Sequence, residues 1–190
     1  MCGCKEILLK PNMISGKLHI VSEAEIPGTS MITDVPCDNL LEVYKVCLQL
    51  EELCEKERGI GISAVQAGLP WKLFLVKSDG SLDFAPKNKY GYFINCHYKN
   101  TTEKRICSLE GCLSLRSDEG RLRQFQVERF TDIQLIGYQL ILKKSYIVLE
   151  KLEVGFDLSL VNQSIIFQHE IDHQNGILIS NNGRELLLWH

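Results

Sequence analysis

The segment His169-Glu170-Ile171-Asp172-His173 carries the clearest chemical pattern in this chain. On an α-helix, residues four positions apart lie on the same face, so His169 and His173 can direct two imidazoles at one metal ion. Glu170, beside the first histidine, can reach a water molecule at that ion. The pattern is typical of metal-dependent hydrolases, in which two histidines bind the metal and the glutamate moves protons.

A catalytic metal site of this kind needs a third protein ligand, because such sites hold three side chains and leave one position open. Downstream, Ile179 stands where the extended zinc-protease pattern places a histidine, and His190 is the last residue. Glu185 lies in a tail that we expect to be too short to fold back. We therefore look upstream, where Cys112 in the segment Leu109–Leu115 offers a thiolate, a good ligand for zinc and iron(II).

Glycines flank this chemistry in two places. Gly111 precedes the cysteine and permits close approach of the backbone. The segment Gly59–Gln66 reads Gly-Ile-Gly-Ile-Ser-Ala-Val-Gln, and its glycines allow another chain to pass near the backbone. Gln66 adds an amide donor at the end of this segment.

Together and in this order, the three segments strongly resemble the motifs of the peptide deformylase family. These motifs are Gly-Φ-Gly-Φ-Ala-Ala-x-Gln, with Φ apolar, then Glu-Gly-Cys-Leu-Ser and Gln-His-Glu-x-Asp-His. Residues 110–114 and 168–173 match the second and third motifs at every fixed position, and Ser63 replaces one alanine of the first. The chain resembles a short form without the long C-terminal helix of many bacterial members, such as a phage-encoded version.

The resemblance implies that Cys112, His169 and His173 bind one divalent metal ion. The physiological ion of the family is usually iron(II), and zinc, nickel or cobalt also suit these ligands. The implied reaction is hydrolysis of the N-formyl group from the initiator methionine of a nascent peptide, which releases formate.

The resemblance also assigns roles in this reaction. Glu170 would take a proton from the attacking water and pass it to the leaving amine. The side-chain amide of Gln66 and the backbone N–H of Leu113 would stabilise the oxyanion. Ile60 and Gly61 would pair with the peptide as an added strand, with Gly111 close to it.

Other positions are less specific. The methionine side chain would enter an apolar pocket that includes Ile165, although Ile165 is explained equally well as ordinary core. Asp172 and Glu110 are expected to orient neighbouring groups rather than to react. The arginine that contacts the substrate in many relatives corresponds to either Arg121 or Arg123.

Composition sets the remaining expectations. A chain of 190 residues, 45% apolar and 24% charged with a net charge of −3, fits one domain over residues 1–190. We expect no direct binding of nucleic acid or anionic membrane. No apolar run approaches the ~20 residues of a spanning helix, and the N-terminus does not resemble a secretory signal. We therefore expect a cytoplasmic protein, and we expect it to be a monomer. The resemblance implies that its partner is the N-formylmethionyl peptide.

Eight cysteines are present, and without a secretory signal we expect most to be reduced and buried. Cys2-Gly3-Cys4 is interpreted as inert. Two alternatives to a deformylase stay open. One is a metalloprotease that cleaves internal peptide bonds, although this chain lacks the downstream third ligand that such proteases use. The other is a structural metal site, which needs a fourth ligand, with Cys107 as the candidate.

The elements that position these residues follow from local patterns. Helical spacing predicts a helix from Asn39 to Arg58, capped by Asp38 and stopped by Gly59. Short runs rich in β-formers between residues 71 and 149 predict mostly antiparallel strands.

A second long helix is predicted to follow Asp157. In it, Val161, Ile165 and His169 step by four, as an apolar stripe that leads to the histidines. We expect an α+β fold of the peptide deformylase kind, with antiparallel sheets around a central metal-binding helix and the first helix outside.

Overall fold

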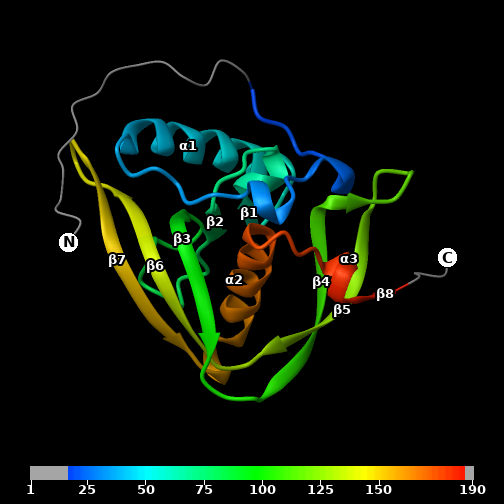
Figure 1. Ribbon diagram of the computed structural model, residues 1–190. Coiled ribbons are helices and arrows are strands. Elements are labelled where there is room, and N and C mark those ends of the chain that lie inside the picture. Colours follow the sequence, from blue (N-terminus) through cyan, green and yellow to red (C-terminus); the bar gives the residue numbers. More distant parts are fainter. Residues whose placement is uncertain (1–16, 187–190) are drawn as a thin grey trace.

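Two antiparallel sheets surround one helix in the computed structural model, which describes residues 17–186 (Figure 1). Cys2, Cys4 and His190 therefore lie outside the described residues. The larger sheet has five strands in the order β1-β2-β3-β6-β7, and the smaller sheet has three in the order β4-β5-β8. Within residues 17–186, no helix is long and apolar enough to span a bilayer.

The bounds of the elements are as follows. The helices are α1 Leu40–Lys56, α2 Val161–Gln174 and the short α3 Ile179–Asn182. The strands are β1 Gly61–Ser63, β2 Leu73–Lys77, β3 Tyr90–Asn100, β4 Arg105–Arg116, β5 Leu122–Phe130, β6 Ile133–Leu142, β7 Ile147–Phe156 and β8 Arg184–Leu186. Four 3-10 turns connect them, namely Glu23–Glu25, Thr29–Met31, Ala64–Ala67 and Leu158–Leu160.

Helix α2 lies between the two sheets, as Figure 1 shows. It contacts β1, β2, β3 and β7 of the larger sheet and β5 of the smaller one. Helix α1 packs on β1, β2 and β7. The predicted α+β fold with the histidine-bearing helix at its centre is therefore confirmed.

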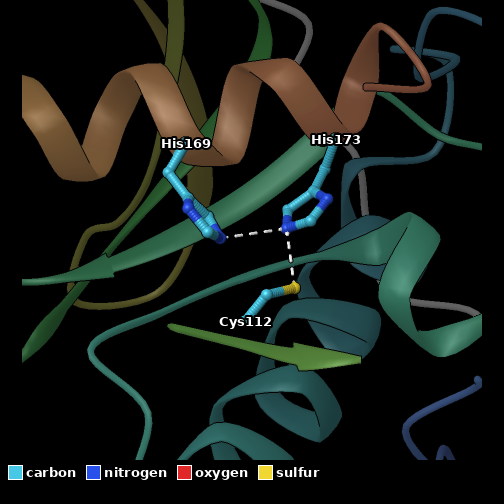
Figure 2. Close-up of side chains that lie close together, drawn as sticks. All are labelled: Cys112, His169 and His173. Atoms are coloured by element: carbon cyan, nitrogen blue, oxygen red, sulfur yellow. Dashed lines mark hydrogen bonds between the residues drawn. The ribbon is translucent and has the colours of Figure 1, made fainter. Parts of the chain in front are cut away.

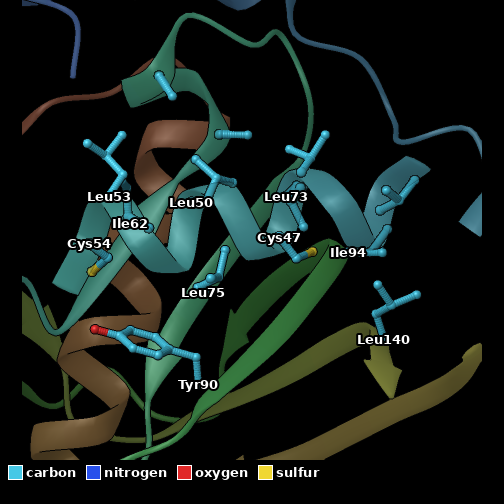
Figure 3. Close-up of a cluster of buried hydrophobic side chains, with 14 of the residues drawn as sticks. Cys47, Leu50, Leu53, Cys54, Ile62, Leu73, Leu75, Tyr90, Ile94 and Leu140 are labelled. Carbon is cyan, nitrogen blue, oxygen red and sulfur yellow. The ribbon is translucent and has the colours of Figure 1, made fainter. Parts of the chain in front are cut away.

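Strand β2 is apolar on both faces because a helix covers each face. Leu73 and Leu75 pack in one cluster with Leu50 of α1 (Figure 3), whereas Phe74 and Val76 belong to a second cluster with residues of α2. Successive side chains of a strand point to opposite faces, so this alternation divides one strand between two cores. The larger sheet is thus held between α1 and α2.

The second cluster fixes α2 through aromatic packing. Phe167 of α2 is 1% exposed, and its ring centroid lies 4.8 Å from that of Phe93 and 5.8 Å from that of Phe74. Edge-to-face aromatic pairs of this kind add to the free energy of burial. Because Phe167 is only two residues from His169, this packing positions the start of the histidine pair.

The apolar stripe predicted for α2 is wrong in part. Val161 and Ile165 are only partly buried, while the buried apolar side chains are Phe167 and Ile171. Much of the buried surface of α2 is polar, and the amide of Gln168 accepts from and donates to the backbone of β5, at 3.0 and 2.9 Å. The helix therefore packs through satisfied polar groups, and its four-step face borders an open pocket.

The starts of the helices differ from prediction by a few residues. Asn39, not Asp38, caps α1, because its side-chain oxygen accepts from the backbone N–H of Glu42 at 3.3 Å. Asp157 caps the 3-10 turn Leu158–Leu160, and α2 begins after that turn. Both caps satisfy N–H groups that the first turn leaves without helical partners.

The end of α1 also differs from prediction, because Arg58 and not Gly59 adopts the left-handed conformation, with φ of 58°. The N–H groups of Arg58 and Gly59 donate to the carbonyls of Glu55 and Cys54, at 3.1 and 2.8 Å. This hydrogen-bond pair is the Schellman closure, whose left-handed position usually holds glycine.

Most cysteines in the described part of the chain are buried thiols, as expected. Burial raises the pKa of Cys54 and Cys96 to about 12, and Cys47 is likewise fully buried. Cys37 and Cys107 are exposed. Cys47, Cys54 and Cys96 therefore remain protonated at neutral pH and act as small apolar side chains.

Candidate metal centre

Strand β4 and helix α2 bring together Cys112, His169 and His173 (Figure 2). The Sγ atom of Cys112 is 3.4 Å from Nε2 of His173, which is 3.2 Å from Nε2 of His169. All three donor atoms lie within 4.8 Å of one another. Across residues 17–186, this is the one group of three or more histidine, cysteine or acidic side chains so arranged, and Cys107 does not belong to it.

These separations fit one divalent ion. Two nitrogens and a sulfur bound tetrahedrally to zinc lie about 3.3–3.6 Å apart, given the usual bond lengths. Of the observed separations, 3.4 Å lies within this range and 3.2 Å lies just below it. A thiolate with two imidazoles is also a donor set that suits zinc, iron(II), cobalt and nickel.

Cys112 lies in strand β4, and the strand is irregular at this point. Strands β4 and β5 pair up to Gly111 opposite Gln124, and pairing resumes at Arg116 opposite Leu122. The residues between Gly111 and Arg116 have no β5 partner in this register, which is the property of a bulge. The backbone N–H of Leu113 therefore lies outside the β4–β5 pairing.

A buried charge network holds the first histidine. Nδ1 of His169 is 2.8 Å from Oε2 of Glu110, and Arg129 donates to both oxygens of Glu110 at 2.8 Å. Arg129 also donates to Asp172 at 2.5 Å. Glu110 and Asp172 thus orient neighbouring groups, and each has its charge paired, as buried charges require.

The same network sets the local protonation. Burial alone raises the pKa of Glu110, but hydrogen bonds from Arg129 and His169 hold it well below its usual range. Burial lowers the pKa of His169, but the bonds to Cys112 and Glu110 outweigh it and raise this pKa to about 10. Burial and the charge of His169 lower the pKa of His173 well below its usual range, so the pKa values of the two imidazoles are shifted in opposite directions.

Glu170 differs from Glu110 because its carboxylate is left without partners. It is 4% exposed, and its Oε2 atom has no hydrogen-bond partner among the described residues. Burial raises its pKa to about 7. It reaches β1 at Gly61, where an added Cβ atom would lie 2.5 Å from Oε1 of Glu170, so any larger residue there would displace the carboxylate.

Gln66 is positioned by the turn that follows β1. The backbone N–H of Ser63 donates to Oε1 of Gln66 at 2.8 Å, and Nε2 of Gln66 donates to Sγ of Cys112 at 3.3 Å. Because its oxygen is already bonded, the amide must present its N–H₂ group to the cluster.

A pocket of about 280 Å³ opens beside Cys112 and His169. The four residues expected to bind the substrate all line this pocket, namely Ile60, Gly61, Gly111 and Ile165. The two expected oxyanion donors, Gln66 and Leu113, line it as well. The lining combines backbone of both sheets with apolar side chains of α2, as small-molecule and peptide pockets commonly do.

The arginines are placed differently from expectation. Arg121 and Arg123 do not line the pocket, and Arg123 pairs with Glu185 at 2.6 Å. Contrary to expectation, the C-terminal segment folds back, because β8 pairs with β5. The carboxylate of Glu185 in β8 nevertheless pairs with Arg123 and does not join the three metal-donor residues. The arginine that lines the pocket is Arg58.

Sequence reasoning also missed Arg129, although a signal was present. Phe125, Val127 and Arg129 are all buried on one face of β5. A period of two marks one face of a strand, so the arginine could have been assigned to the buried side.

Comparison with known proteins gives the family. The family model described as polypeptide deformylase matches residues 30–186. The chain belongs to the peptide deformylase family. A peptide deformylase of Mycoplasmopsis pulmonis (strain UAB CTIP) is 30% identical over 145 residues, covering 69% of this chain and 68% of that protein.

Solved structures of peptide deformylases share the fold. The enzyme of class I type b from Acinetobacter baumannii, bound to Met-Ala-Ser, has a TM-score of 0.68 at 23% identity, over 88% of this chain and 100% of that chain. A probable peptide deformylase from Synechococcus phage S-SSM7 has a TM-score of 0.63 at 21% identity, over 87% and 99%.

Membership brings an activity with it. Peptide deformylases are metal-dependent hydrolases that remove the N-formyl group from nascent peptides, and this chain is such an enzyme. The family is metal-dependent, and the close group of Cys112, His169 and His173 could hold a metal ion.

Proposed function

We propose that Cys112, His169 and His173 hold one divalent metal ion and that Glu170 transfers the protons of formyl-peptide hydrolysis. The convergence of three donor atoms beside a buried carboxylate without a partner supports this most directly. When bound, the ion supplies a Lewis acid that makes water nucleophilic near neutral pH.

Glu170 suits a double role as base and then acid. A group exchanges protons most effectively when its pKa lies near the working pH, and burial raises the pKa of Glu170 to about 7. It takes a proton from the attacking water and delivers it to the amine that leaves. Contact with the backbone at Gly61 limits where its carboxylate can lie.

The oxyanion formed on the formyl group needs donors that are already in place. Nε2 of Gln66 is fixed by the bond between its oxygen and Ser63. The N–H of Leu113 lies outside the β4–β5 pairing. Two preoriented donors stabilise the transition state without reorganisation.

The substrate enters as an extended peptide. Strands β1 and β4 are each at an edge of their sheet, and Gly61 and Gly111 bring both edges to the same pocket. A free edge presents unpaired backbone groups that an added strand can bind. We place the methionine side chain against Ile165. The Met-Ala-Ser bound to the enzyme of Acinetobacter baumannii supports a peptide of this length.

We propose iron(II) as the physiological metal, with zinc, nickel and cobalt able to occupy the same donors. An iron-bound thiolate is open to oxidation by oxygen and peroxide. Activity of the iron form is therefore expected to decline in air while nickel and cobalt forms persist. Equal lifetimes of all three forms contradict this choice. We further propose a cytoplasmic monomer with one domain over residues 1–190.

The test is formate release from formyl-Met-Ala-Ser by protein purified without oxygen, together with metal analysis. Glu170→Gln is expected to keep the metal and lower kcat by about 10²–10⁴-fold, because only proton transfer is removed. Glu185→Gln, which alters a carboxylate outside the pocket, is the matched control. Near-normal turnover of Glu170→Gln removes Glu170 from this role.

The same assay separates the alternatives. A metalloprotease would cleave unformylated casein and release no formate. A purely structural site would bind metal and show neither activity. It would also need a fourth ligand, and no further cysteine or histidine joins the cluster within the described part of the chain.

A further inference from the structure

We propose that Arg58 makes this enzyme prefer formylated peptides with an acidic side chain at the second or third residue. The inference rests on the proposed function, because it concerns the substrate of the same pocket.

Arg58 is the exposed charge of the pocket. The other charged or titratable side chains in the lining are Glu110, Cys112, His169 and Glu170, and Cys112 is buried. Both glutamates are buried and His169 is partly buried, whereas Arg58 is exposed at the rim. A peptide that leaves the pocket toward solvent therefore meets one accessible charge, and that charge is positive.

The guanidinium of Arg58 is also available. Its neighbour Glu55 pairs with Lys77 at 2.8 Å, and Glu57 pairs with Arg116 at 2.8 Å. Within residues 17–186, no carboxylate lies at ion-pair distance from Arg58. A carboxylate of the substrate would thus gain a partner without displacing an existing one.

The path of the peptide leads from the donors to Arg58. The reacting end is marked by Glu170, which touches β1 at Gly61. The residues that precede β1 lead from this buried point to the surface. Gly61 is buried, Ile60 is 59% exposed and Arg58 is exposed. One edge of β1 is occupied by β2, so the peptide has the other edge.

This placement sets the register of the contact. The formyl end lies at Gly61, so the peptide runs outward in the direction opposite to β1. An extended chain advances about 3.4 Å per residue. The second and third residues therefore pass the segment from Ile60 to Arg58, within reach of an arginine side chain.

The other exposed side chains of the rim are apolar, and Gln124, which is partly buried in the lining, is uncharged, so neither can form an ion pair with an acid. Ile60, Leu109 and Leu122 line the same pocket and are 59%, 64% and 37% exposed. They contact the apolar parts of any peptide. Discrimination between an acid and its neutral amide therefore depends on Arg58.

The experiment compares acid with amide in matched pairs of peptides. The pairs are formyl-Met-Asp-Ser with formyl-Met-Asn-Ser, and formyl-Met-Ala-Asp with formyl-Met-Ala-Asn, each with an amidated C-terminus. We expect kcat/KM of the acid to exceed that of the amide by about two- to fivefold in at least one pair, the range for an exposed ion pair. The difference should lie in KM, because the contact is far from the reacting carbon.

The variants are compared through the acid-to-amide ratio within each protein. Arg58→Gly is expected to bring the ratio to one and to fold well, because glycine favours the left-handed conformation. Arg58→Lys should keep a ratio above one. Arg105→Gln, which removes a surface arginine outside the pocket, should keep the wild-type ratio. For the wild type, raising the salt should lower the ratio, because exposed ion pairs are screened.

Three outcomes of this experiment contradict the inference, and they have different meanings. A wild-type ratio of one in both pairs, with all peptides deformylated, overturns the role of Arg58 and leaves the proposed function intact. A lack of formate from every peptide overturns both. A ratio that persists in Arg58→Gly assigns the selection to another residue and also overturns the inference.

Discussion

Two buried glutamates, Glu170 in helix α2 and Glu110 in strand β4, differ in their hydrogen bonding and in the direction of their pKa shifts. On the side of β5, Glu110 accepts from Arg129 and His169, and its pKa is held below the usual range. On the side of β1, Glu170 meets Gly61 and has an oxygen without a partner among the described residues. Its pKa is raised to about 7 by burial.

The difference teaches how one helix separates structure from reactivity. A saturated carboxylate stays ionised and fixes the geometry of a histidine, so it contributes to position. An unsaturated carboxylate is poised to gain a proton, so it contributes to chemistry. Both types of contact are set by what the facing strand offers, arginine in β5 and glycine in β1.

The largest expected effect is the loss of stability when Glu110, like Glu170, is left without an arginine partner. Arg129→Met leaves Glu110 and Asp172 buried without their cation. Such a loss destabilises a protein by about 3–5 kcal/mol. Urea unfolding measures it, with Arg105→Met, an exposed arginine near the start of β4, as the control. Equal midpoints for both variants contradict the importance of the network.

Crowding the Glu170 side is expected to affect turnover more than stability. In Gly61→Ala, the new methyl group would lie 2.5 Å from Oε1 of Glu170 and must displace it. A displacement near 1 Å at a reacting group lowers the rate by about 100-fold. The measurement is kcat for formate release. Gly155→Ala, where a methyl group meets nothing within 4 Å, should behave as the wild type.

The two glutamine substitutions should have opposite profiles. Glu170→Gln keeps metal and loses turnover, whereas Glu110→Gln removes the carboxylate that orients His169. Loss of such a partner lowers metal affinity by about 10–100-fold. Competition with a chelator measures the affinity. If Glu110→Gln binds metal as tightly as the wild type, the orienting role of Glu110 is wrong.

An exposed, paired carboxylate gives the smallest effect. Glu185→Gln breaks the surface pair with Arg123, and exposed pairs contribute about 0.2–1 kcal/mol. Hydrogen bonding to Arg123 lowers the pKa of Glu185, so the contribution is present at neutral pH and disappears as the pH falls through the folded-state pKa. Unfolding of wild type and variant should therefore converge in acid.

Much of this arrangement could be predicted from sequence because it is local. The positions of His169 and His173 on one helical face follow from a spacing of four, and the family motifs add Cys112 and Gln66. The antiparallel strands follow from short β-rich runs between turns. The structure brings Cys112, His169 and His173 close together and has the predicted fold class.

What could not be predicted depends on contacts between distant segments. The pairing of Arg129 with Asp172 joins residues 43 positions apart. The partial exposure of Ile165 depends on an open pocket that no local pattern encodes. The left-handed Arg58 contradicts the preference for glycine, so the sequence indicated the next residue, Gly59. The cap of α1 is Asn39 and not the predicted Asp38, because both adjacent residues are favoured at this position and local sequence does not choose between them.

The origin of the three donors has a consequence for folding. Cys112 belongs to the smaller sheet, and both histidines belong to the helix packed against the larger one. An ion bound by all three fastens the two sheets together, so binding energy becomes folding energy. The stability of the folded enzyme then depends on the concentration of metal in its surroundings, and a shortage of that metal favours unfolding.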